Sequence, residues 1–576
     1  MNLLLRLRRT PRLILLSVVL GIVGGLAAQL FEWLLDTAER LLLTSMSGYQ
    51  YLTAEQAHDL SHAPAIPHWL WLIPVVTTLG GLLSGWLVYT FAPEAEGHGT
   101  DSAVKAFHQS GGKIRGRIPL VKSVASAITI GSGGSAGREG PTAQIAAGIG
   151  SIVATFFRLP ADERRYVVLM GMAAGLSAIF QSPLGTAIFA VEILYSSMAF
   201  EGEALLFTLI ASAVAYAVTG LFEGFGTAFL VTNDVTFYGA VDLVWFAALG
   251  LVCGAVGALL PTVFYRTRDA FQRLPLPPMF RPALGGLILG IIGIFLPQLL
   301  GGGYGIIQLA LDHTAGMTVA FLLLLALAKI VALSLTVGSG GSGGVFAPSL
   351  YVGALLGASL AGLFQLTGVD VNATALAVVG MAALFAGAAR VPIANLVMVT
   401  EMTGGYGLIV PTMVAVAISF VIQSVLTRGA RYPTLYEAQV ESPAESPVHH
   451  EEYYRATAKL LRRRQVQLEE DILRHEFITT LAAGKAVPLA NGSNGNEALY
   501  SFTIPEESSL LECSLRELHL ANVLFVSVIR DTKELIPNGD TVLRAGDQVV
   551  IAATPTSVAD FRKLLAGRGA SPTAVN

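Results

Sequence analysis

Gly131-Ser132-Gly133-Gly134-Ser135-Ala136-Gly137-Arg138-Glu139-Gly140-Pro141 is a glycine-rich segment that occurs twice in this chain. The second copy reads Gly338-Ser339-Gly340-Gly341-Ser342-Gly343-Gly344-Val345-Phe346-Ala347-Pro348, and seven of the eleven positions are identical. Both copies lie between long apolar stretches. Backbone N–H and C=O groups cannot stay unpaired in hydrocarbon, so an irregular segment survives at membrane depth only where protein or water surrounds it. Because paired glycine-rich breaks in corresponding halves point to a transporter's substrate site, the repeat predicts an ion pathway.

A second set of matches extends the repeat. Gly171-Met172-Ala173-Ala174, Pro183 and Glu192 recur at one constant offset as Gly380-Met381-Ala382-Ala383, Pro392 and Glu401. Coincidence within Gly/Ala-rich sequence does not readily keep a proline and a glutamate in register with a four-residue match. We therefore infer two homologous halves, with sites at the interface between them. The residues alone leave open whether the halves are parallel or inverted.

The composition places most of the chain in lipid. Of its 576 residues, 53% are apolar and 13% are charged, whereas about a quarter of the residues in soluble domains are charged. Residues 441–576 hold 32 of the 76 Asp, Glu, Lys and Arg residues. This break predicts a membrane domain over 1–440, a linker with a charged helix over 441–498 and a small domain over 499–576. The net charge of −4 argues against nucleic-acid binding.

Apolar stretches of mixed length fill the first 440 residues. They cover residues 13–35, 69–92, 118–130, 142–157, 166–195, 204–222, 240–265, 281–300, 317–337, 345–368, 374–400 and 406–427. A bilayer core needs about 20 helical residues, so some stretches are too short and others hold two partial helices. We expect an all-α polytopic membrane domain in which some helices end at the glycine-rich segments. Four arginines among the first twelve residues predict a cytoplasmic N-terminus.

The tail reads as a small α+β domain. Strand patterns cover 500–504, 523–530 and 548–553, and helix patterns cover 510–518 and 556–565. A charged segment, 451–482, has helical periodicity. The two cysteines, Cys253 and Cys513, fall in different domains and suggest no disulfide framework.

Three motifs, Gly137-Arg138-Glu139-Gly140-Pro141, Gly344-Val345-Phe346-Ala347-Pro348 and Leu435-Tyr436, resemble those of the CLC chloride channel and transporter family. The resemblance covers about residues 12–440. It implies a homodimer with one anion pathway per subunit, an inverted repeat in each subunit and half-helix ends aimed at a central anion. Helix N-termini suit this role because they present free N–H groups and a positive dipole end. For a bacterial member it further implies the plasma membrane, cytoplasmic termini, chloride as the bound substrate and no cofactor.

The resemblance assigns roles to particular residues. Glu139 matches the gating glutamate, whose carboxylate occupies the anion site and then swings away or takes up a proton. Val345 and Phe346 match positions whose backbone amides bind the anion, and Tyr436 matches a tyrosine whose hydroxyl donates to it. The surrounding backbone completes the expected anion site. Its further residues are Gly97, His98, Gly99, Gly137, Arg138, Gly140 and Gly344.

Two positions depart from the family pattern. His98 stands where a serine usually helps to coordinate the anion, and Asp101 stands where a proline is usual. A histidine could donate a ring N–H to an anion, or it could turn away and leave coordination to backbone amides; both alternatives stay open. Ile193 stands where proton-coupled exchangers commonly carry the inner glutamate, and Glu192 matches the preceding glutamate that channels share. Glu192 and Ile193 thus mark the candidate inner proton path, with an aliphatic residue at its usual acceptor.

The tail resembles the C-terminal lobe of RCK (regulator of potassium conductance) domains. The matching residues are Ile504-Pro505, Leu515 to Leu518, Ile536 to Leu543 and Ala545-Gly546-Asp547. Such lobes usually dimerise and can bind small regulatory ligands or ions, so the tail is either a regulatory domain with an unknown ligand or a passive dimerisation module.

Together these observations predict chloride transport with channel-like or weakly proton-coupled conduction gated by Glu139. The alternative is a chloride/proton antiporter, which the intact Glu139 and Tyr436 allow. Fluoride export is disfavoured because Pro141 is present, and a membrane sensor without transport is disfavoured because the anion-site motifs are complete. An enzyme finds no support, since the sequence shows no nucleophile constellation, metal-ligand spacing or phosphate-binding loop in its expected context.

Overall fold

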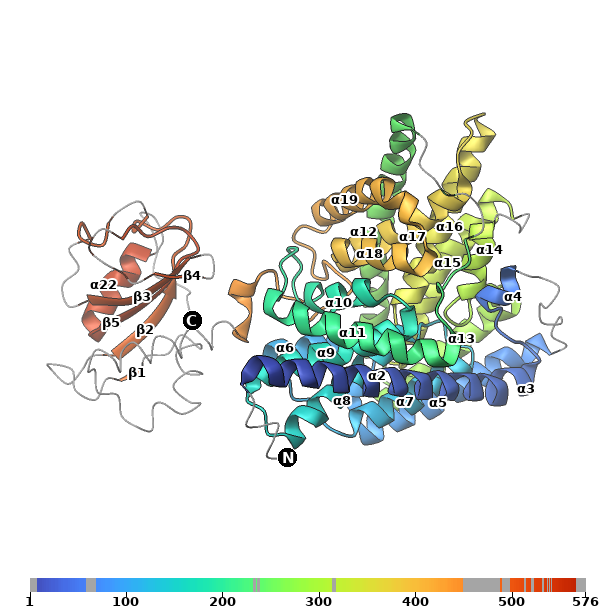
Figure 1. Ribbon diagram of the computed structural model, residues 1–576, viewed down its shortest axis with the longest axis horizontal. Coiled ribbons are helices and arrows are strands. Elements are labelled where there is room, and N and C mark those ends of the chain that lie inside the picture. The colour runs from blue at the N-terminus through green and yellow to red at the C-terminus, as the bar shows by residue number, and fades with distance from the viewer. Residues whose placement is uncertain are drawn as a thin grey trace. The chain divides into compact units, whose positions relative to one another are not determined.

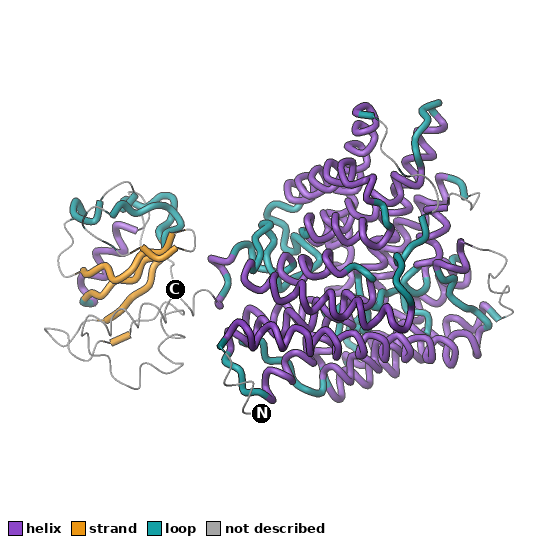
Figure 2. The backbone as a smooth tube through the Cα atoms, viewed as in Figure 1, coloured by secondary structure: helices purple, strands orange, loops and turns teal. Residues whose placement is uncertain are grey.

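The structure is a computed structural model of the chain (Figure 1). It describes residues 8–58, 69–231, 235, 239–312, 317–448, 487–488, 498–511, 514–518, 523–530, 533–535, 537, 539 and 541–565. The chain forms two compact units, Met1–Glu441 and Ser442–Asn576. Helices build the first unit and the strands lie in the second (Figure 2).

Among the described residues of the first unit, eight helices are long and apolar enough to cross a membrane. They are α2 (Arg9–Glu39, continued by a π-turn and α3, Ser45–Ser47), α5 (Ile73–Phe91), α11 (Gly202–Glu223), α12 (Leu243–Arg273), α13 (Arg281–Phe295), α15 (Val319–Val337), α16 (Phe346–Leu366) and α19 (Ile409–Leu426). The other helices are α4 (Ala54–His58), α6 (Thr100–Gln109), α7 (Ile118–Gly131), α8 (Glu139–Phe156), α9 (Ala161–Phe180), α10 (Pro183–Glu192), α14 (Tyr304–Asp312), α17 (Ala373–Ala389) and α18 (Pro392–Thr403). The expected mixture of full and partial helices is confirmed.

Two apolar stretches that exceed one span split at equivalent points. The stretch 166–195 breaks between α9 and α10, where Gln181 adopts a left-handed conformation with φ 53°. The stretch 374–400 breaks between α17 and α18, where Arg390 has φ 55°. A proline opens the following helix in both cases, as suits a position whose N–H has no partner within the helix.

The two halves form an inverted repeat. Helices α5 to α11 in the first half correspond in order to α13 to α19 in the second, and α2 corresponds to α12. At the centre Gly137 pairs with Gly344, its own counterpart in the other copy of the glycine-rich segment, and the pairing is antiparallel. Equivalent backbone segments therefore run in opposite directions where the halves meet.

Each half also caps a helix of the other half. The Glu401 carboxylate, at the end of α18, accepts hydrogen bonds from Ser182 Oγ at 2.6 Å and from the backbone N–H of Gly185 at 2.8 Å. These donors lie at the start of α10, where the first N–H groups lack partners within the helix. The carboxylate also interacts favourably with the positive end of the helix dipole.

Glu192 makes the reciprocal contact. Its carboxylate accepts hydrogen bonds from the backbone N–H groups of Ile393 at 3.1 Å and Ala394 at 2.7 Å, in the first turn of α18. Helices α10 and α18 therefore lock together through two equivalent carboxylates. Glu192 therefore caps a helix, whereas the sequence had suggested it only as part of a candidate proton path.

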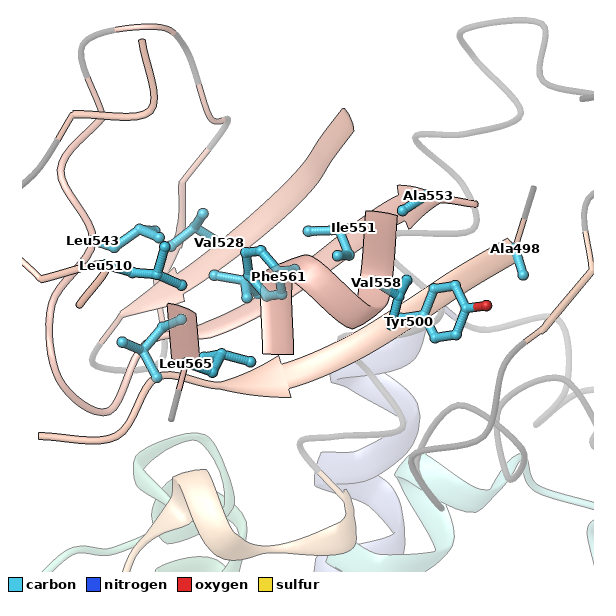
Figure 3. Close-up of a cluster of buried hydrophobic side chains, with 12 residues drawn as sticks. Ala498, Tyr500, Leu510, Val528, Leu543, Ile551, Ala553, Val558, Phe561 and Leu565 are labelled. Carbon is cyan, nitrogen blue, oxygen red and sulfur yellow. The ribbon is translucent and has the colours of Figure 1, made fainter. Parts of the chain in front are cut away.

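The second unit contains a five-stranded antiparallel sheet in the order β1-β2-β5-β3-β4. Its elements are β1 (Val487–Pro488), β2 (Ala498–Thr503), β3 (Val523–Arg530), β4 (Lys533–Leu535), β5 (Gln548–Ala553) and the helix α22 (Pro555–Leu565). Phe561 of α22 and Ile551 of β5 lie in the buried cluster shown in Figure 3. The three expected strands and the last helix are confirmed.

One expected helix of the tail is wrong. Residues 510–518 form turns in the parts that the structure describes, with an isolated bridge between Ser514 and Val542. The Leu515 N–H donates to the Thr541 carbonyl at 2.9 Å, and Glu517 accepts a hydrogen bond from the Ser514 N–H. Tertiary pairing thus takes the backbone groups that a helix would have used. The charged segment 451–482 lies outside the described residues.

The reciprocal caps yield a stability prediction. We expect Glu401→Ala to lower the free energy of unfolding by on the order of 2 kcal/mol, because two partly buried donors and one exposed donor at the start of α10 lose their acceptor. Thermal denaturation of the purified protein in detergent would measure this loss as a lower Tm. The exposed Glu55 provides the control, and an equal Tm for Glu401→Ala and Glu55→Ala would contradict the capping role.

Candidate functional site

Three glycine-rich backbone segments meet at the centre of the first unit. Gly137 and Gly344 exchange two backbone hydrogen bonds, with N···O distances of 2.8 and 2.6 Å. Gly97 donates to the Gly341 carbonyl at 3.2 Å and accepts from the Gly343 N–H at 3.3 Å. The irregular segments thus satisfy one another's polar groups, which is the condition for such backbone at membrane depth.

The glycines of these segments are required by close approach. A Cβ atom at Gly140 would collide with the His98 carbonyl oxygen, and one at Gly344 would lie 2.8 Å from the Gly140 nitrogen. Gly99 has φ 87° and would also place a Cβ against the Gly140 carbonyl. These expected anion-site glycines therefore bring three chain segments within backbone contact of one another.

Lys122 holds the segment that contains Gly97 in place. Its ammonium group is fully buried and donates to the carbonyls of Ala95 at 3.0 Å and Gly97 at 2.7 Å. Because an ammonium group has three donors and no acceptor, it binds the carbonyl oxygens of the segment and not its N–H groups. The positive charge also favours an anion nearby.

Three helices begin at this meeting point: α6 at Thr100, α8 at Glu139 and α16 at Phe346. Their first turns supply free N–H groups and positive dipole ends, the features that bind anions at helix N-termini. A small cavity of about 10 Å³ lies among them. Its lining residues are Thr100, Glu139, Gly140, Leu176, Phe180, Phe189, Val345, Phe346 and Tyr436, and we call it the central pocket. It has room for about one water-sized group.

The Glu139 side chain lies in the central pocket. It is 1% exposed, and its carboxylate accepts a hydrogen bond from the Tyr304 hydroxyl. The Ala347 N–H, in the first turn of α16, lies 3.5 Å from its second oxygen. The carboxylate thus stands in for an anion at the start of α16. A carboxylate and a free anion would compete for the same donors.

Arg138 points away from the pocket despite standing next to Glu139. Its guanidinium forms an ion pair with Glu32 of α2 and lies 5.1 Å from the centre of the Tyr304 ring. Its backbone, which precedes α8, remains beside the pocket. The expected anion-site role of Arg138 therefore reduces to backbone geometry and to a positive charge held by Glu32.

Tyr436 closes the opposite side of the pocket. It is 2% exposed, and its side chain hydrogen-bonds with Thr100 at the start of α6. The Asp101 carboxylate accepts a hydrogen bond from the Ala438 N–H at 2.8 Å, which ties the segment after Tyr436 to α6. Asp101, a departure from the family pattern, thus holds Tyr436 in place.

His98 lies beside Tyr436, at the edge of a larger cavity. The two rings meet edge to face with centres 5.2 Å apart, and His98 is 8% exposed. Its Nδ1 atom is buried and has no hydrogen-bond partner within the described residues. The cavity measures about 440 Å³ and is lined by charges of both signs, among them Lys105, Arg268 and Glu96. We call it the His98 cavity.

A second large cavity lies on the Arg138 side. It measures about 430 Å³ and is lined by Arg138 and Tyr304, together with the acidic residues Glu32, Asp36, Glu39 and Glu223. We call it the Arg138 cavity. Glu139 thus lies in a narrow pocket with a larger cavity near each of two sides. Tyr304, which contacts Glu139, lines the Arg138 cavity, and His98, which contacts Tyr436, lines the His98 cavity.

The candidate proton-path residues lie apart from these spaces. Ile193 is fully buried, and neither it nor Glu192 is among the described residues that line the central pocket or the two cavities. Sequence reasoning also missed Thr100 and Tyr304. The repeat carried a signal for both, because Gly97-His98-Gly99-Thr100 and Gly301-Gly302-Gly303-Tyr304 occupy corresponding places before α6 and α14.

Comparisons with known proteins agree with this arrangement. The family model described as "Voltage gated chloride channel" matches residues 80–424, and the model described as "TrkA-C domain" matches residues 499–566. A Ralstonia nicotianae protein named "Putative chloride channel protein ClcB-like" is 34% identical over 368 residues, covering 62% of this chain and 83% of the relative. A Citrobacter koseri protein named "H(+)/Cl(-) exchange transporter ClcA" is 32% identical over 424 residues, covering 71% and 85%.

A solved structure has the same fold. The crystal structure titled as a slow cyanobacterial Cl-/H+ antiporter superposes with a TM-score of 0.62 at 24% identity, covering 73% of this chain and 96% of the other. At this identity the likeness shows the fold alone. The mixed and interrupted helices of the first unit are therefore those of a known membrane architecture.

Proposed function

Because the chain belongs to the voltage-gated chloride channel family, we propose that its first unit carries chloride across a membrane through the central pocket. The observation that carries the proposal is the Glu139 carboxylate. It occupies the pocket as an anion would, against the first turn of α16 and between two large cavities. Chloride that takes its place would meet the same N–H donors and helix dipoles.

In this proposal Glu139 is the gate. While the carboxylate lies in the pocket, it excludes chloride because both bind the same positive potential. A proton neutralises the carboxylate and weakens its hold on the donors, so the side chain leaves and chloride enters. Chloride then moves between the Arg138 cavity and the His98 cavity, passing Tyr436 at the narrow end.

We favour conduction with little or no proton coupling. A proton that crosses an apolar interior needs ionisable groups or a chain of water molecules. Ile193 cannot carry a proton, and the Glu192 carboxylate is bound to two N–H groups at the start of α18. The route from Glu139 to the His98 side therefore lacks the usual relay at this position.

A chloride/proton antiporter is the second candidate. Glu139 and Tyr436 are both in place, and one relative at 32% identity is named an exchange transporter. Fluoride export stays disfavoured because Pro141 is present as the third residue of α8. The protein would work as a homodimer in a bacterial plasma membrane, with cytoplasmic termini, and the second subunit and lipid would together cover its exposed apolar side chains.

His98 would bind chloride on the side of its own cavity. Its Nδ1 is buried without a partner among the residues that the structure describes, and such an atom is costly unless a ligand or water supplies the missing hydrogen bond. In the tautomer that protonates Nδ1, the ring donates to an anion. This supports the donor alternative over a histidine that turns away.

The tail would regulate the first unit. It matches a TrkA-C domain, and we propose that an unidentified small cytosolic ligand binds it. Such a ligand changes transport only if it binds two states of the domain with different affinity.

The gate can be tested with Glu139→Gln. We expect the variant to conduct chloride from proteoliposomes with a flux that no longer depends on pH, because the group that takes up the proton is gone. Chloride and pH electrodes recorded together would measure both ions. Unchanged flux and unchanged pH dependence would reject Glu139 as the gate. In the unmutated protein, strong uphill proton movement driven by a chloride gradient would reject weak coupling in favour of exchange.

The donor role of His98 can be tested by chloride binding. We expect His98→Ala to weaken binding by about tenfold, the loss of a hydrogen bond to a charged group. His98→Asn keeps an N–H donor and should recover part of the affinity. Isothermal titration of chloride into the protein in chloride-free detergent solution gives both values. Equal affinities for all three proteins would show that backbone amides alone coordinate the anion.

Regulation by the tail can be tested by a deletion after Val448. The cut keeps Val440 and Glu441, whose carbonyls accept hydrogen bonds from the Ser196 and Ser197 N–H groups at 2.9 and 3.1 Å. We expect the shortened protein to conduct chloride but to lose its response to cytosolic small molecules. Identical rates and responses for both proteins, across a panel of nucleotides, would reduce the tail to a dimerisation module.

A further inference from the structure

Tyr304 stands at the same place in the second half as Thr100 in the first. It is the first residue of α14, directly after Gly301, Gly302 and Gly303. The buried Lys329 donates to the carbonyls of Leu299 at 2.8 Å and Gly301 at 2.7 Å. Lys122 holds the segment before Thr100 through the same pattern. The inverted repeat thus places two hydroxyl groups at equivalent positions around the central pocket.

The two hydroxyls have different partners. Thr100 contacts Tyr436, whereas Tyr304 donates its hydroxyl hydrogen to the Glu139 carboxylate. The carboxylate also interacts with the backbone N–H of Glu139 itself and with the Ala347 N–H, which lies 3.5 Å away and is long for a hydrogen bond. A hydrogen bond from a hydroxyl to an ionised carboxylate is charge-assisted and stronger than a bond between neutral groups. Tyr304 is therefore the main side-chain donor that holds Glu139 where it lies.

The Tyr304 side chain has two further neighbours, Arg138, with which it also hydrogen-bonds, and Phe229. The Arg138 guanidinium lies 5.1 Å from the ring centre, and its own position is fixed by the ion pair with Glu32. Phe229 stacks on the ring with centres 5.9 Å apart and an interplanar angle of 22°, and Phe229 is fully buried. A ring packed in this way aims its hydroxyl at one point and loses little further freedom when the hydrogen bond forms.

The hydroxyl lies at the boundary between two spaces. Tyr304 lines the Arg138 cavity, and its partner Glu139 lines the central pocket. A carboxylate that leaves the pocket toward the Arg138 cavity must first break the hydrogen bond to Tyr304.

We propose that Tyr304 is a positioning residue that holds the Glu139 carboxylate in the central pocket through its hydroxyl and so sets how readily chloride displaces it. The inference rests on the proposed role of Glu139 as the gate. It goes further because it says which residue stabilises the closed state, in which the Glu139 carboxylate lies in the pocket. That residue belongs to the second half of the repeat and lies outside the three motifs that carry the family resemblance. Removal of the hydroxyl should weaken the closed state and favour chloride, while removal of the carboxylate should make the hydroxyl irrelevant.

The experiment compares four full-length proteins: the unmutated chain, Tyr304→Phe, Glu139→Ala and the double variant. Chloride affinity is measured by isothermal titration and initial chloride efflux in proteoliposomes. Tyr304→Phe keeps the ring next to Arg138 and Phe229 and removes the hydroxyl, with its hydrogen bonds to Glu139 and Arg138. We expect it to tighten chloride binding by about tenfold and to raise the efflux rate, because the competing carboxylate loses a charge-assisted hydrogen bond. In the Glu139→Ala background we expect Tyr304→Phe to change neither quantity.

Tyr49→Phe is the matched control. Tyr49 lines the same cavity, but its hydroxyl donates to the Pro297 carbonyl at 3.0 Å, so its removal should leave chloride binding unchanged. A merely structural role for Tyr304 would produce equal effects in both backgrounds, and that result would overturn the inference. The inference would also be overturned if Glu139→Ala changes chloride affinity and efflux but Tyr304→Phe leaves both as in the unmutated protein. If Glu139→Ala itself changes nothing, the gate assignment fails and the inference fails with it.

Discussion

The pairing of unsatisfied backbone groups is the constraint on which the rest of this structure depends. Three irregular segments meet inside an apolar domain, and each must find partners for its N–H and C=O groups. Gly137 and Gly344 supply them to each other, and Gly97 pairs with the second segment as well. Because only glycine permits such close approach, the segments leave room for three helix starts to converge. The convergence of three helix N-termini, on which the proposed anion site depends, thus follows from how the backbone is satisfied.

The inverted repeat then places polar side chains in equivalent pairs, and some pairs have diverged. Lys122 and Lys329 still hold corresponding loops, and Glu192 and Glu401 still cap each other's helices. At the centre the equivalence is lost: Glu139 corresponds to Phe346, and Thr100 corresponds to Tyr304. Structural pairs have kept their chemistry, whereas the positions around the central pocket have not. That contrast separates residues that hold the fold from those at the proposed anion site.

Much of this arrangement could be predicted from the sequence, and the rest could not, for physical reasons. The glycine-rich repeat predicted the broken helices, and the constant offset predicted equivalent halves, because both depend on local residue patterns. The family resemblance implied that Glu139 and Phe346 belong to one site, and both line the central pocket. Tyr304 was missed because the repeat marks it only as the counterpart of Thr100, whereas its contact with Glu139 joins segments that lie far apart in the sequence. Residues 510–518 were wrongly expected to be helical because their leucine spacing fits a helix, while a distant segment claims the backbone. Glu192 matched a family position, but only the structure showed its partners on α18.

The reciprocal caps carry a consequence for how the chain is made. Glu192 and its partner Ala394 are separated by 202 positions, and the pairing of the two glycine-rich segments spans a similar length. The first half therefore leaves the ribosome with a polar break and an uncapped helix whose partners do not yet exist. Closing so long a loop costs entropy before the contacts repay it, which makes such pairings slow. Until the second half follows, the nascent first half must keep its central segment in contact with water or with the insertion machinery. Assembly of the two halves is then a late step of biosynthesis, and the folded domain is stabilised by contacts that neither half can make alone.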